Sequence, residues 1–329
     1  MRPRMLFVLY RLILFYIVLG NACIFLGCVC RVNSGGKDTA ALCCVRRSIQ
    51  RLTGGVLSAW EAVCLHCGIS TACFYPQETA DALQLLCSAG IHTTEIFLNT
   101  FSELQPEYVS RLEEILSSAN TRVMALHPFS SMLETFFFAS GYPNRLQDGL
   151  ALYRRYFEVC QTLHIPRLVF HGDYVQTQFP FIRHCENYLL LRRAAREYGV
   201  ELCQENVVRC KCGRPEYILQ MREYTKDDVS FVLDVKQMRR ADVPLAEMLA
   251  AMRGRIAHVH LSDAVPENDC VAPGKGDFPF DALFRTLRET GFAGEMVIEL
   301  YRGGFSTLEE LQASAAQMER MYADGGRIP

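Results

Sequence analysis

Short apolar runs and longer amphipathic stretches alternate along the chain from about Val63 onward. The short runs are rich in β-branched and aromatic residues and have the length of strands, whereas the longer stretches repeat their apolar residues at the spacing of a helix face. Eight strands are expected, at residues 64–70, 93–98, 122–127, 167–171, 201–205, 230–234, 256–260 and 295–300. The helices expected around them span residues 77–88, 106–118, 145–163, 183–198, 215–224, 245–252, 281–290 and 307–322.

Strands that alternate with helices in this way form a parallel sheet with helical crossovers. Eight such units in about 260 residues, with a helix after the last strand, favour a closed (β/α)8 TIM barrel over an open doubly wound sheet. The open sheet usually has a glycine-rich turn after its first strand, and this chain has none there. The expected fold class is therefore α/β, with a barrel domain over residues 61–329.

A different pattern occupies residues 1–60, which we separate from the barrel. Residues 5–29 are strongly apolar, interrupted by Arg11 and Asn21, and are long enough to span a bilayer of ~30 Å as a helix. Taken literally, this segment is a membrane anchor that holds the barrel outside the cytoplasm. The alternative is a mis-called start upstream of a cytoplasmic barrel, because a cysteine- and arginine-rich stretch without periodicity separates the apolar run from Val63. A cleaved signal peptide ranks third, because no small-x-small cleavage site follows the apolar run cleanly.

Charge is unevenly divided between these two parts. Residues 1–55 contain eight Lys or Arg and one acid, for a net charge of +7, and the other 274 residues contain 26 basic and 35 acidic side chains, for −9. An acidic body without a Lys/Arg-rich block repels phosphate backbones, which argues against nucleic acid as a partner. The fifteen cysteines are scattered through a chain that can build its own core, so reduced thiols are expected instead of a disulfide framework or a structural zinc site.

Polar residues close the predicted strands. In a (β/α)8 barrel the carboxyl ends of the strands meet at one mouth, where the functional site lies. A buried acid or histidine costs several kcal/mol unless it is paired or bound to a metal, so a ring of them around one axis is difficult to explain as core packing. A metal ion would satisfy them together. The residues concerned are Glu95, His127, His171, Glu205, Asp234, His260 and Glu299.

Some of these residues also have simpler interpretations. Glu95 is equally compatible with a pair to a neighbouring arginine or with hydrogen bonds to the barrel floor. His127 and His171 precede turns, but their position on adjacent strands favours contacts to a substrate. His258 lies on the same strand face as His260, one layer deeper, and is expected to pack behind the site or support it from there.

Five short motifs stand near these strand ends, and their order and spacing are specific as a set. They read QEN, LDVKQ, HVHLSD, PGKGDFPF and VIELY, at residues 204–206, 233–237, 258–263, 273–280 and 297–301. Together they resemble the sugar phosphate isomerase/epimerase branch of the xylose isomerase-like barrels. Three carboxylates and one imidazole suit a hard or borderline cation. The resemblance implies one divalent cation, Mn²⁺, Mg²⁺ or Co²⁺ with Zn²⁺ as an alternative, held by Glu205, Asp234, His260 and Glu299.

The same superfamily includes endonuclease IV, an abasic-site nuclease with three zinc ions, and the HVHLSD motif resembles its metal loop as well. The nuclease has a zinc-binding histidine three residues after the aspartate of strand six, where this chain has Gln237 after Asp234. An amide is a poor zinc ligand, and residues 264–273 lack the second histidine expected there. A trinuclear site is therefore not expected.

The residues permit proton transfer next to a carbonyl group. A cation that holds the carbonyl and adjacent hydroxyl oxygens of a sugar stabilises the enediolate formed when the neighbouring carbon loses its proton. Glu205 and Glu299 flank the metal position from different strands, so one can remove the proton and the other can return it. The expected enzyme is a metal-dependent isomerase or epimerase of a sugar or sugar phosphate.

Further residues are expected to hold this substrate. The backbone N–H groups of Gly274 and Gly276 are additional donors for a substrate anion, although both glycines are equally compatible with a simple turn. The side-chain candidates are His127, His171 and Gln237 for hydroxyl groups, and Lys236, Lys275 and Arg302 for a phosphate or carboxylate.

Two other kinds of function stay open. A metal-dependent lyase or dehydratase acting on a cyclitol or keto acid would use the same enolate chemistry and would release water. A non-catalytic sugar-binding barrel would be expected to lose one carboxylate of the set, and all four ligand candidates are present. In each case the expected partner is a small molecule, and assembly into a homo-oligomer is compatible with the sequence.

Overall fold

The computed structural model describes residues 22–25, 28–31 and 66–324. The chain divides into two compact units, residues 1–64 and residues 65–329, and each is described by itself.

The first unit contains a small hairpin. Its strands β1 (Ala22–Phe25) and β2 (Cys28–Arg31) pair in antiparallel fashion. The rest of the predicted anchor at residues 5–29 lies outside the described residues. Within the described ranges, no helix is both long enough and apolar enough to cross a membrane.

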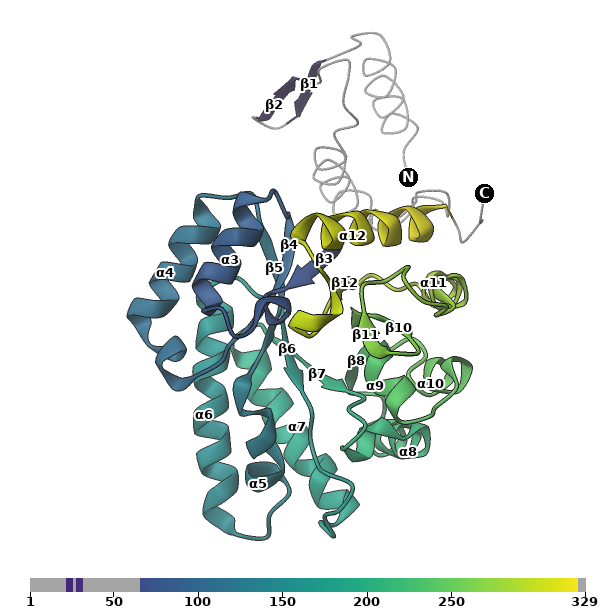
Figure 1. Ribbon diagram of the computed structural model, residues 1–329. Helices are drawn as coiled ribbons and strands as arrows, with labels where there is room; N and C mark the ends of the chain where they lie inside the picture. The colour runs from purple at the N-terminus through teal and green to yellow at the C-terminus, as the bar shows by residue number, and fades with distance from the viewer. Residues whose placement is uncertain (1–21, 26–27, 32–65, 325–329) are drawn as a thin grey trace, which may run out of the picture. The chain divides into compact units, whose positions relative to one another are not determined.

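Eight parallel strands close into a barrel in the second unit (Figure 1). Each strand pairs with the next barrel strand along the chain, and the last pairs with the first. The prediction of a (β/α)8 barrel is confirmed. The barrel strands are β3 (Cys67–Ser70), β4 (Thr93–Phe97), β5 (Arg122–His127), β6 (Arg167–Phe170), β7 (Glu201–Glu205), β8 (Ser230–Asp234), β9 (Ile256–Leu261) and β12 (Glu295–Ile298).

The eight predicted helices are present and surround the strands (Figure 1). Their bounds differ from the predicted ones by at most two residues at either end. These helices are α3 (Thr79–Ser88), α4 (Pro106–Ser117), α6 (Pro143–Thr162), α7 (Phe181–Glu197), α8 (Pro215–Thr225), α10 (Leu245–Ala251), α11 (Phe280–Glu289) and α12 (Leu308–Ala323).

Local sequence explains how several of these helices begin and pack. Proline occupies the first turn of α4, α6 and α8, where its missing N–H breaks no intrahelical hydrogen bond. Helix α11 buries one apolar stripe with the spacing of a helix face. The stripe consists of Phe280, Leu283, Phe284 and Leu287.

Shorter elements were not predicted. Helix α5 (Glu134–Phe138) precedes α6, and α9 (Val235–Arg240) follows β8 directly. After β9, the strands β10 (Asp263–Val265) and β11 (Asn268–Val271) form an antiparallel hairpin. Three predicted strands end earlier than expected: β4 ends at Phe97, β6 ends before His171, and β12 ends before Glu299.

An apolar layer lies inside the barrel beneath the mouth. Ala125, Val169, Cys203 and Val232 pack together there from β5, β6, β7 and β8. Because side chains alternate along a strand, the residue two positions further on points to the same side, one layer closer to the carboxyl end. Those positions hold the buried polar residues His127, His171, Glu205 and Asp234.

Candidate active site

The side chain of Asn206 and the first turn of α9 hold Asp234 at the end of β8. Its N–H donates to Asn206 Oδ1 (2.7 Å), and Asn206 Nδ2 donates to the Asp234 carbonyl (3.0 Å). Asp234 Oδ1 accepts the N–H of Gln237 (2.8 Å) and caps the first turn of α9. The other oxygen, Oδ2, is buried and accepts no hydrogen bond from the described residues. One carboxylate oxygen therefore holds the helix, and the second is left for a ligand.

Glu205, at the end of β7, faces two histidines. His171 Nε2 lies 2.8 Å and His127 Nε2 lies 3.7 Å from Glu205 Oε2, and the two Nε2 atoms are 3.1 Å apart. Oε2 still accepts no well-aligned hydrogen bond within the described structure. Burial would raise the pKa of Glu205, but the charge of His171 and the contacts with both imidazoles hold it well below its usual range. Glu205 is therefore an ionised oxygen donor at neutral pH.

Glu95 orients His260. His260 Nε2 lies 2.9 Å and His258 Nε2 lies 3.1 Å from Glu95 Oε2, while Ser70 Oγ donates to Glu95 Oε1 (3.1 Å). Burial would raise the pKa of Glu95, but the charge of His260 and the hydrogen bonds from both histidines keep it well below its usual range. A carboxylate at Nε2 fixes the imidazole so that Nδ1 is available to a ligand on the other side. The suggested arginine partner of Glu95 was wrong, whereas His258 supports the site from behind as expected.

Glu205, Asp234 and His260 converge on one point. His260 Nδ1 lies 3.7 Å from Glu205 Oε1 and 3.8 Å from Asp234 Oδ2, and one ligand atom from each residue lies within 4.8 Å of the others. Oxygen atoms bound at about 2.1 Å to one Mg²⁺ ion are separated by roughly 3–4 Å. Three buried atoms here, Glu205 Oε2, Asp234 Oδ2 and His260 Nδ1, have no hydrogen-bond partner in the described part of the chain. The three residues fit a divalent cation.

Glu299 borders the same point, one residue beyond β12. Its Oε2 lies 3.5 Å from His260 Nδ1 and 3.0 Å from Lys236 Nζ. The Lys236 ammonium is also 3.5 Å from Asp234 Oδ2. Burial would raise the pKa of Glu299, but the charges of Lys236 and His260 lower it. The fourth predicted ligand is therefore ionised and adjoins the other three, with an ammonium group on one of its oxygens.

Residues 83–323, nearly three-quarters of the chain, match the family model described as the xylose isomerase-like TIM barrel. The chain belongs to this family. The resemblance of the five motifs to the xylose isomerase-like barrels is confirmed at the level of this family. Four of those motifs contribute the side chains that meet at the barrel mouth: Glu205, Asp234, His260 and Glu299.

Individual relatives of this family member are distant. An inosose isomerase of Halalkalibacterium halodurans is 25% identical over 144 residues, which are 40% of this chain and 50% of that protein. The chain thus spans about half the length of this curated relative. The solved structure of D-psicose 3-epimerase with D-tagatose from Clostridium cellulolyticum H10 superposes with a TM-score of 0.63 at 14% identity, over 80% of this chain and 100% of the epimerase. A xylose isomerase-like TIM barrel protein from Mycobacterium smegmatis in complex with magnesium has a TM-score of 0.64 at 13% identity, over 82% of this chain and 100% of that one.

Beside the predicted ligand set, this xylose isomerase-like barrel has a second group of ligand atoms. His127, His171 and Glu205 also bring one ligand atom each to within 4.8 Å of the others. The ring of His127 stacks on Phe97, with ring centroids 4.4 Å apart. Burial would lower the pKa of His127, but its contact with Glu205 and the nearby carboxylate charges raise it. An imidazole N–H donates a hydrogen bond, so the His127 ring can make the predicted contact with a substrate oxygen.

Gln237 is tied to the neighbouring loop. Its Oε1 accepts the N–H of Val208 (3.2 Å), and its own N–H binds Asp234. The residue that replaces the nuclease's zinc-binding histidine therefore uses its side-chain oxygen to connect α9 with the segment after β7.

Lys275 and Arg302 have partners outside the ligand set. Lys275 Nζ lies 3.4 Å from Glu310, and Arg302 donates to the carbonyl of Phe305 (3.3 Å) and lies over its ring. Both side chains are exposed. No contact among the described residues brings these two predicted substrate cations to the four proposed ligands.

The glycine turn after β11 binds a carboxylate of its own chain. Asp263 Oδ2 accepts the N–H groups of Gly274 (3.0 Å) and Gly276 (2.9 Å), and Asp263 Oδ1 accepts that of Phe278 (3.2 Å). Gly274 has φ +89°, and a Cβ atom at Gly276 would lie 1.9 Å from the carbonyl oxygen of Ala264. The suggestion that these amides bind a substrate anion was wrong, because Asp263 occupies them.

Glu134 of α5 was missed by the sequence reasoning. Its Oε2 accepts the N–H groups of His171 (2.7 Å) and Gly172 (2.6 Å), and its Oε1 accepts the Tyr153 hydroxyl. This buried carboxylate fixes the backbone that carries His171. Periodicity contains no signal for this contact, because Glu134 lies 37 residues before His171.

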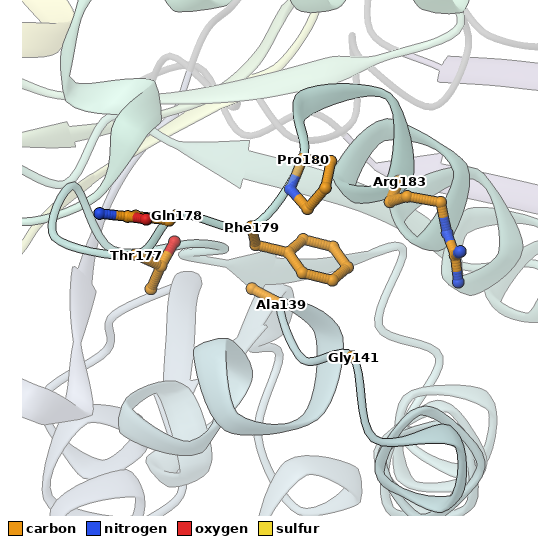
Figure 2. Close-up of a pocket in the computed structure, with 7 residues that line it drawn as sticks. All are labelled: Ala139, Gly141, Thr177, Gln178, Phe179, Pro180 and Arg183. Atoms are coloured by element: carbon orange, nitrogen blue, oxygen red, sulfur yellow. The ribbon is translucent and has the colours of Figure 1, made fainter.

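A cavity of about 420 Å³ lies between the end of α5 and the start of α7 (Figure 2). The ring of Phe179 extends among the lining residues in this view. Arg183 is the one ionisable side chain of the lining, so the cavity lacks the convergent acids and imidazoles of the mouth. The lining residues are Ala139, Gly141, Thr177, Gln178, Phe179, Pro180 and Arg183.

Proposed function

We propose that this protein is a divalent-metal-dependent isomerase or epimerase of a sugar or sugar phosphate. It removes a proton from a carbon next to the carbonyl group and returns a proton to the same carbon or to the neighbouring one. The observation that carries this proposal is the meeting of Glu205, Asp234 and His260, whose ligand atoms lie within 4.8 Å of one another. Each of the three residues also has a buried atom without a well-aligned hydrogen bond in the described residues: Glu205 Oε2, Asp234 Oδ2 and His260 Nδ1. Buried ionic groups left in this state are costly unless a ligand satisfies them. A divalent cation bound by these residues and Glu299 supplies Lewis-acid polarisation of the substrate carbonyl.

The carboxylates of Glu205 and Glu299 carry out the proton transfer. They reach the mouth from β7 and from the end of β12, and both approach His260 Nδ1, at 3.7 Å and 3.5 Å. A substrate carbon held between them can lose a proton to one carboxylate and receive a proton from the other. Transfer across opposite faces gives an epimer, and transfer on one face converts an aldose into a ketose.

His127 and His171 are placed to hold the substrate. Both lie beside Glu205 Oε2, at 3.7 Å and 2.8 Å, so a hydroxyl group near this carboxylate meets two imidazole donors. The hydrogen bonds that Glu134 accepts from the backbone of His171 and Gly172 keep one of these donors in place. Preorganised donors of this kind stabilise negative charge that develops on a substrate oxygen.

The named relatives support a polyhydroxylated ketone as the substrate class. D-psicose 3-epimerase acts on a ketose, and an inosose is a cyclitol ketone. The match to inosose isomerase favours a cyclitol ketone as the second candidate substrate. A lyase or dehydratase acting on such a cyclitol would form the same anion and would release water.

A substrate screen tests this proposal. The purified protein is incubated with ketoses, their phosphates and inososes in Mn²⁺, and again after metal removal with EDTA, and the products are identified by NMR and mass spectrometry. We expect one substrate to convert to an isomer of identical mass, with loss of conversion in EDTA and recovery with Mn²⁺. A product lighter by one water would assign a dehydratase, and conversion that is insensitive to EDTA would contradict the metal-dependent mechanism.

A further inference from the structure

Lys236 places a buried positive charge against the proposed metal ligands. It stands in the first turn of α9, two residues after Asp234, and its side chain is 5% exposed. A buried ammonium group is costly unless carboxylates surround it. Both of its ionic partners, Glu299 (3.0 Å) and Asp234 (3.5 Å), are themselves proposed metal ligands.

The contacts of Lys236 leave it little freedom to move away. Its Nζ lies 5.0 Å from the centre of the Tyr301 ring, and Tyr301 is held in turn by Arg240, whose Nη1 donates to the Tyr301 hydroxyl (2.9 Å). The cation thus lies between two carboxylates and an aromatic face, both of which attract it. The charges of Asp234 and Glu299 outweigh burial and raise the pKa of Lys236 well above its usual range.

Lys236 also shares oxygen atoms with the metal position. Asp234 Oδ2 and Glu299 Oε2 are the oxygens nearest His260 Nδ1 from these residues, at 3.8 Å and 3.5 Å, and the same two oxygens contact Lys236 Nζ. A carboxylate oxygen has two lone pairs, so it can bind a metal ion and an ammonium group together. A cation bound by these oxygens would nevertheless be repelled by the neighbouring ammonium.

Lys236 changes the net charge of the proposed metal site. Glu205, Asp234 and Glu299 carry three negative charges, so a divalent cation leaves one in excess. The charge of Lys236 cancels that excess. Glu95 lies behind His260 and is not one of the ligands. A ligand set whose excess negative charge is cancelled accepts an anionic oxygen ligand more readily than one that keeps this excess.

We propose that Lys236 is a fixed counter-charge of the metal site, which weakens binding of the divalent cation and strengthens binding of an anionic oxygen ligand to the loaded site. This inference rests on the proposed function only in that the four ligands bind a divalent cation. It differs from a structural role, because a lysine that merely held the two carboxylates in place would strengthen metal binding.

Mn²⁺ titration of the full-length protein tests whether Lys236 weakens binding of the divalent cation. Free Mn²⁺ is measured by electron paramagnetic resonance for wild type, Lys236→Met and Arg253→Met; Arg253 is exposed, so its variant controls for loss of one positive charge. We expect the Lys236→Met protein to bind Mn²⁺ at least tenfold more tightly than wild type, with no change in Arg253→Met. Lys236→Gln, which keeps a hydrogen-bond donor for Glu299, replaces the methionine variant if that protein does not fold. Equal or weaker Mn²⁺ binding in the uncharged variant would overturn the inference.

Oxalate, which has two adjacent anionic oxygens, tests whether Lys236 strengthens binding of an anionic ligand to the metal-loaded site. Calorimetric titration of Mn²⁺-saturated protein should give at least tenfold weaker oxalate binding in Lys236→Met than in wild type, and unchanged oxalate affinity would overturn the counter-charge role. Failure of the proposed function is recognised separately. Wild type without Mn²⁺ binding contradicts the metal-dependent function; the counter-charge role then stands if Lys236→Met gains Mn²⁺ binding and falls if it does not.

Discussion

Asp234 divides its two oxygens between the fold and the proposed metal. In Asp234→Asn the amide oxygen can still accept the Gln237 N–H that now binds Oδ1 at 2.8 Å. The amide nitrogen takes the place of Oδ2, which accepts no hydrogen bond from the described residues. We expect Mn²⁺ affinity to fall by more than the 10–100-fold typical for loss of a supporting residue, with the far-ultraviolet circular dichroism spectrum unchanged. Undiminished Mn²⁺ binding would exclude Asp234 as a ligand.

Glu95 acts on the metal through His260. Replacing it with glutamine removes the ionised acceptor that lies 2.9 Å from His260 Nε2, so the imidazole is less firmly oriented and less basic. We expect Glu95→Gln to weaken Mn²⁺ binding about 10–100-fold, measured by the same titration. Glu113→Gln is the control, because Glu113 is exposed on α4. Equal affinity in the two variants would mean that Glu95 does not orient His260.

For single residues, the sequence predicted which side chains face the inside of the barrel better than it predicted which side chains they contact. The period of two along a strand places His127, Glu205 and Asp234 on the inward face, and the structure finds them there, buried above the apolar layer. The period of two contains no information on which side chain from another strand will face each of these residues. The link between Glu95 and His260, which lie 165 residues apart, therefore had to come from the structure.

Long helices and strands were predicted from the sequence, whereas the shortest ones were not. The eight barrel strands and their helices produce several repeats of a periodic pattern, and they were found with small errors at their ends. Helix α5, with 5 residues, and strand β10, with 3, are too short to produce a pattern. The hairpin β10–β11 precedes the PGKGDFPF motif, in a segment where no element was predicted. Asp263 at the start of this hairpin is the residue that occupies the amides of the glycine turn.

Helix α7 contains a histidine whose protonation opposes folding. His184 is buried, and Tyr217 OH lies 2.7 Å from its Nδ1. Burial and the charge of Lys211 lower the pKa of His184 to about 4 and outweigh the opposite effect of Asp173. The unfolded chain binds this proton near pH 6.5, so the stabilising contribution of neutral His184 is complete above pH 6.5 and is lost as the pH falls toward 4.

This titration predicts a measurable difference between pH 7 and pH 4.5. Over that range wild type should lose about 2–3 kcal/mol more unfolding free energy than His184→Gln, in line with about 1.4 kcal/mol per pKa unit. Urea unfolding at both pH values measures this, with His92→Gln as the control because His92 is exposed. Parallel losses in wild type and His184→Gln would contradict the assignment.

For the whole molecule, the alternation of eight strands and helices was sufficient to predict a closed barrel, because the number of units and the short connections leave few other topologies. The hairpin of β1 and β2 was not predicted, since the apolar run containing it has no alternating pattern.

The barrel unit should fold without the preceding residues. All eight barrel strands and the helices around them lie within residues 65–329, and the barrel's sheet is closed by its own first and last strands. A chain truncated to residues 60–329 should therefore give a cooperative unfolding transition and a folded circular dichroism spectrum. An unfolded or aggregated product would show that the earlier residues contribute to the barrel's stability.

Solvent deuterium exchange measures the central claim most directly. With the substrate found by screening, the Mn²⁺-loaded wild type in D₂O should place deuterium on the carbon next to the carbonyl as the isomer forms. Glu205→Gln and Glu299→Gln, each with metal occupancy confirmed, should both lose net conversion, because an amide does not transfer a proton as a carboxylate does. The variant that keeps the abstracting carboxylate should still exchange the substrate proton. Full conversion by metal-loaded Glu299→Gln, or conversion by wild type without deuterium at that carbon, would contradict proton transfer between two carboxylates.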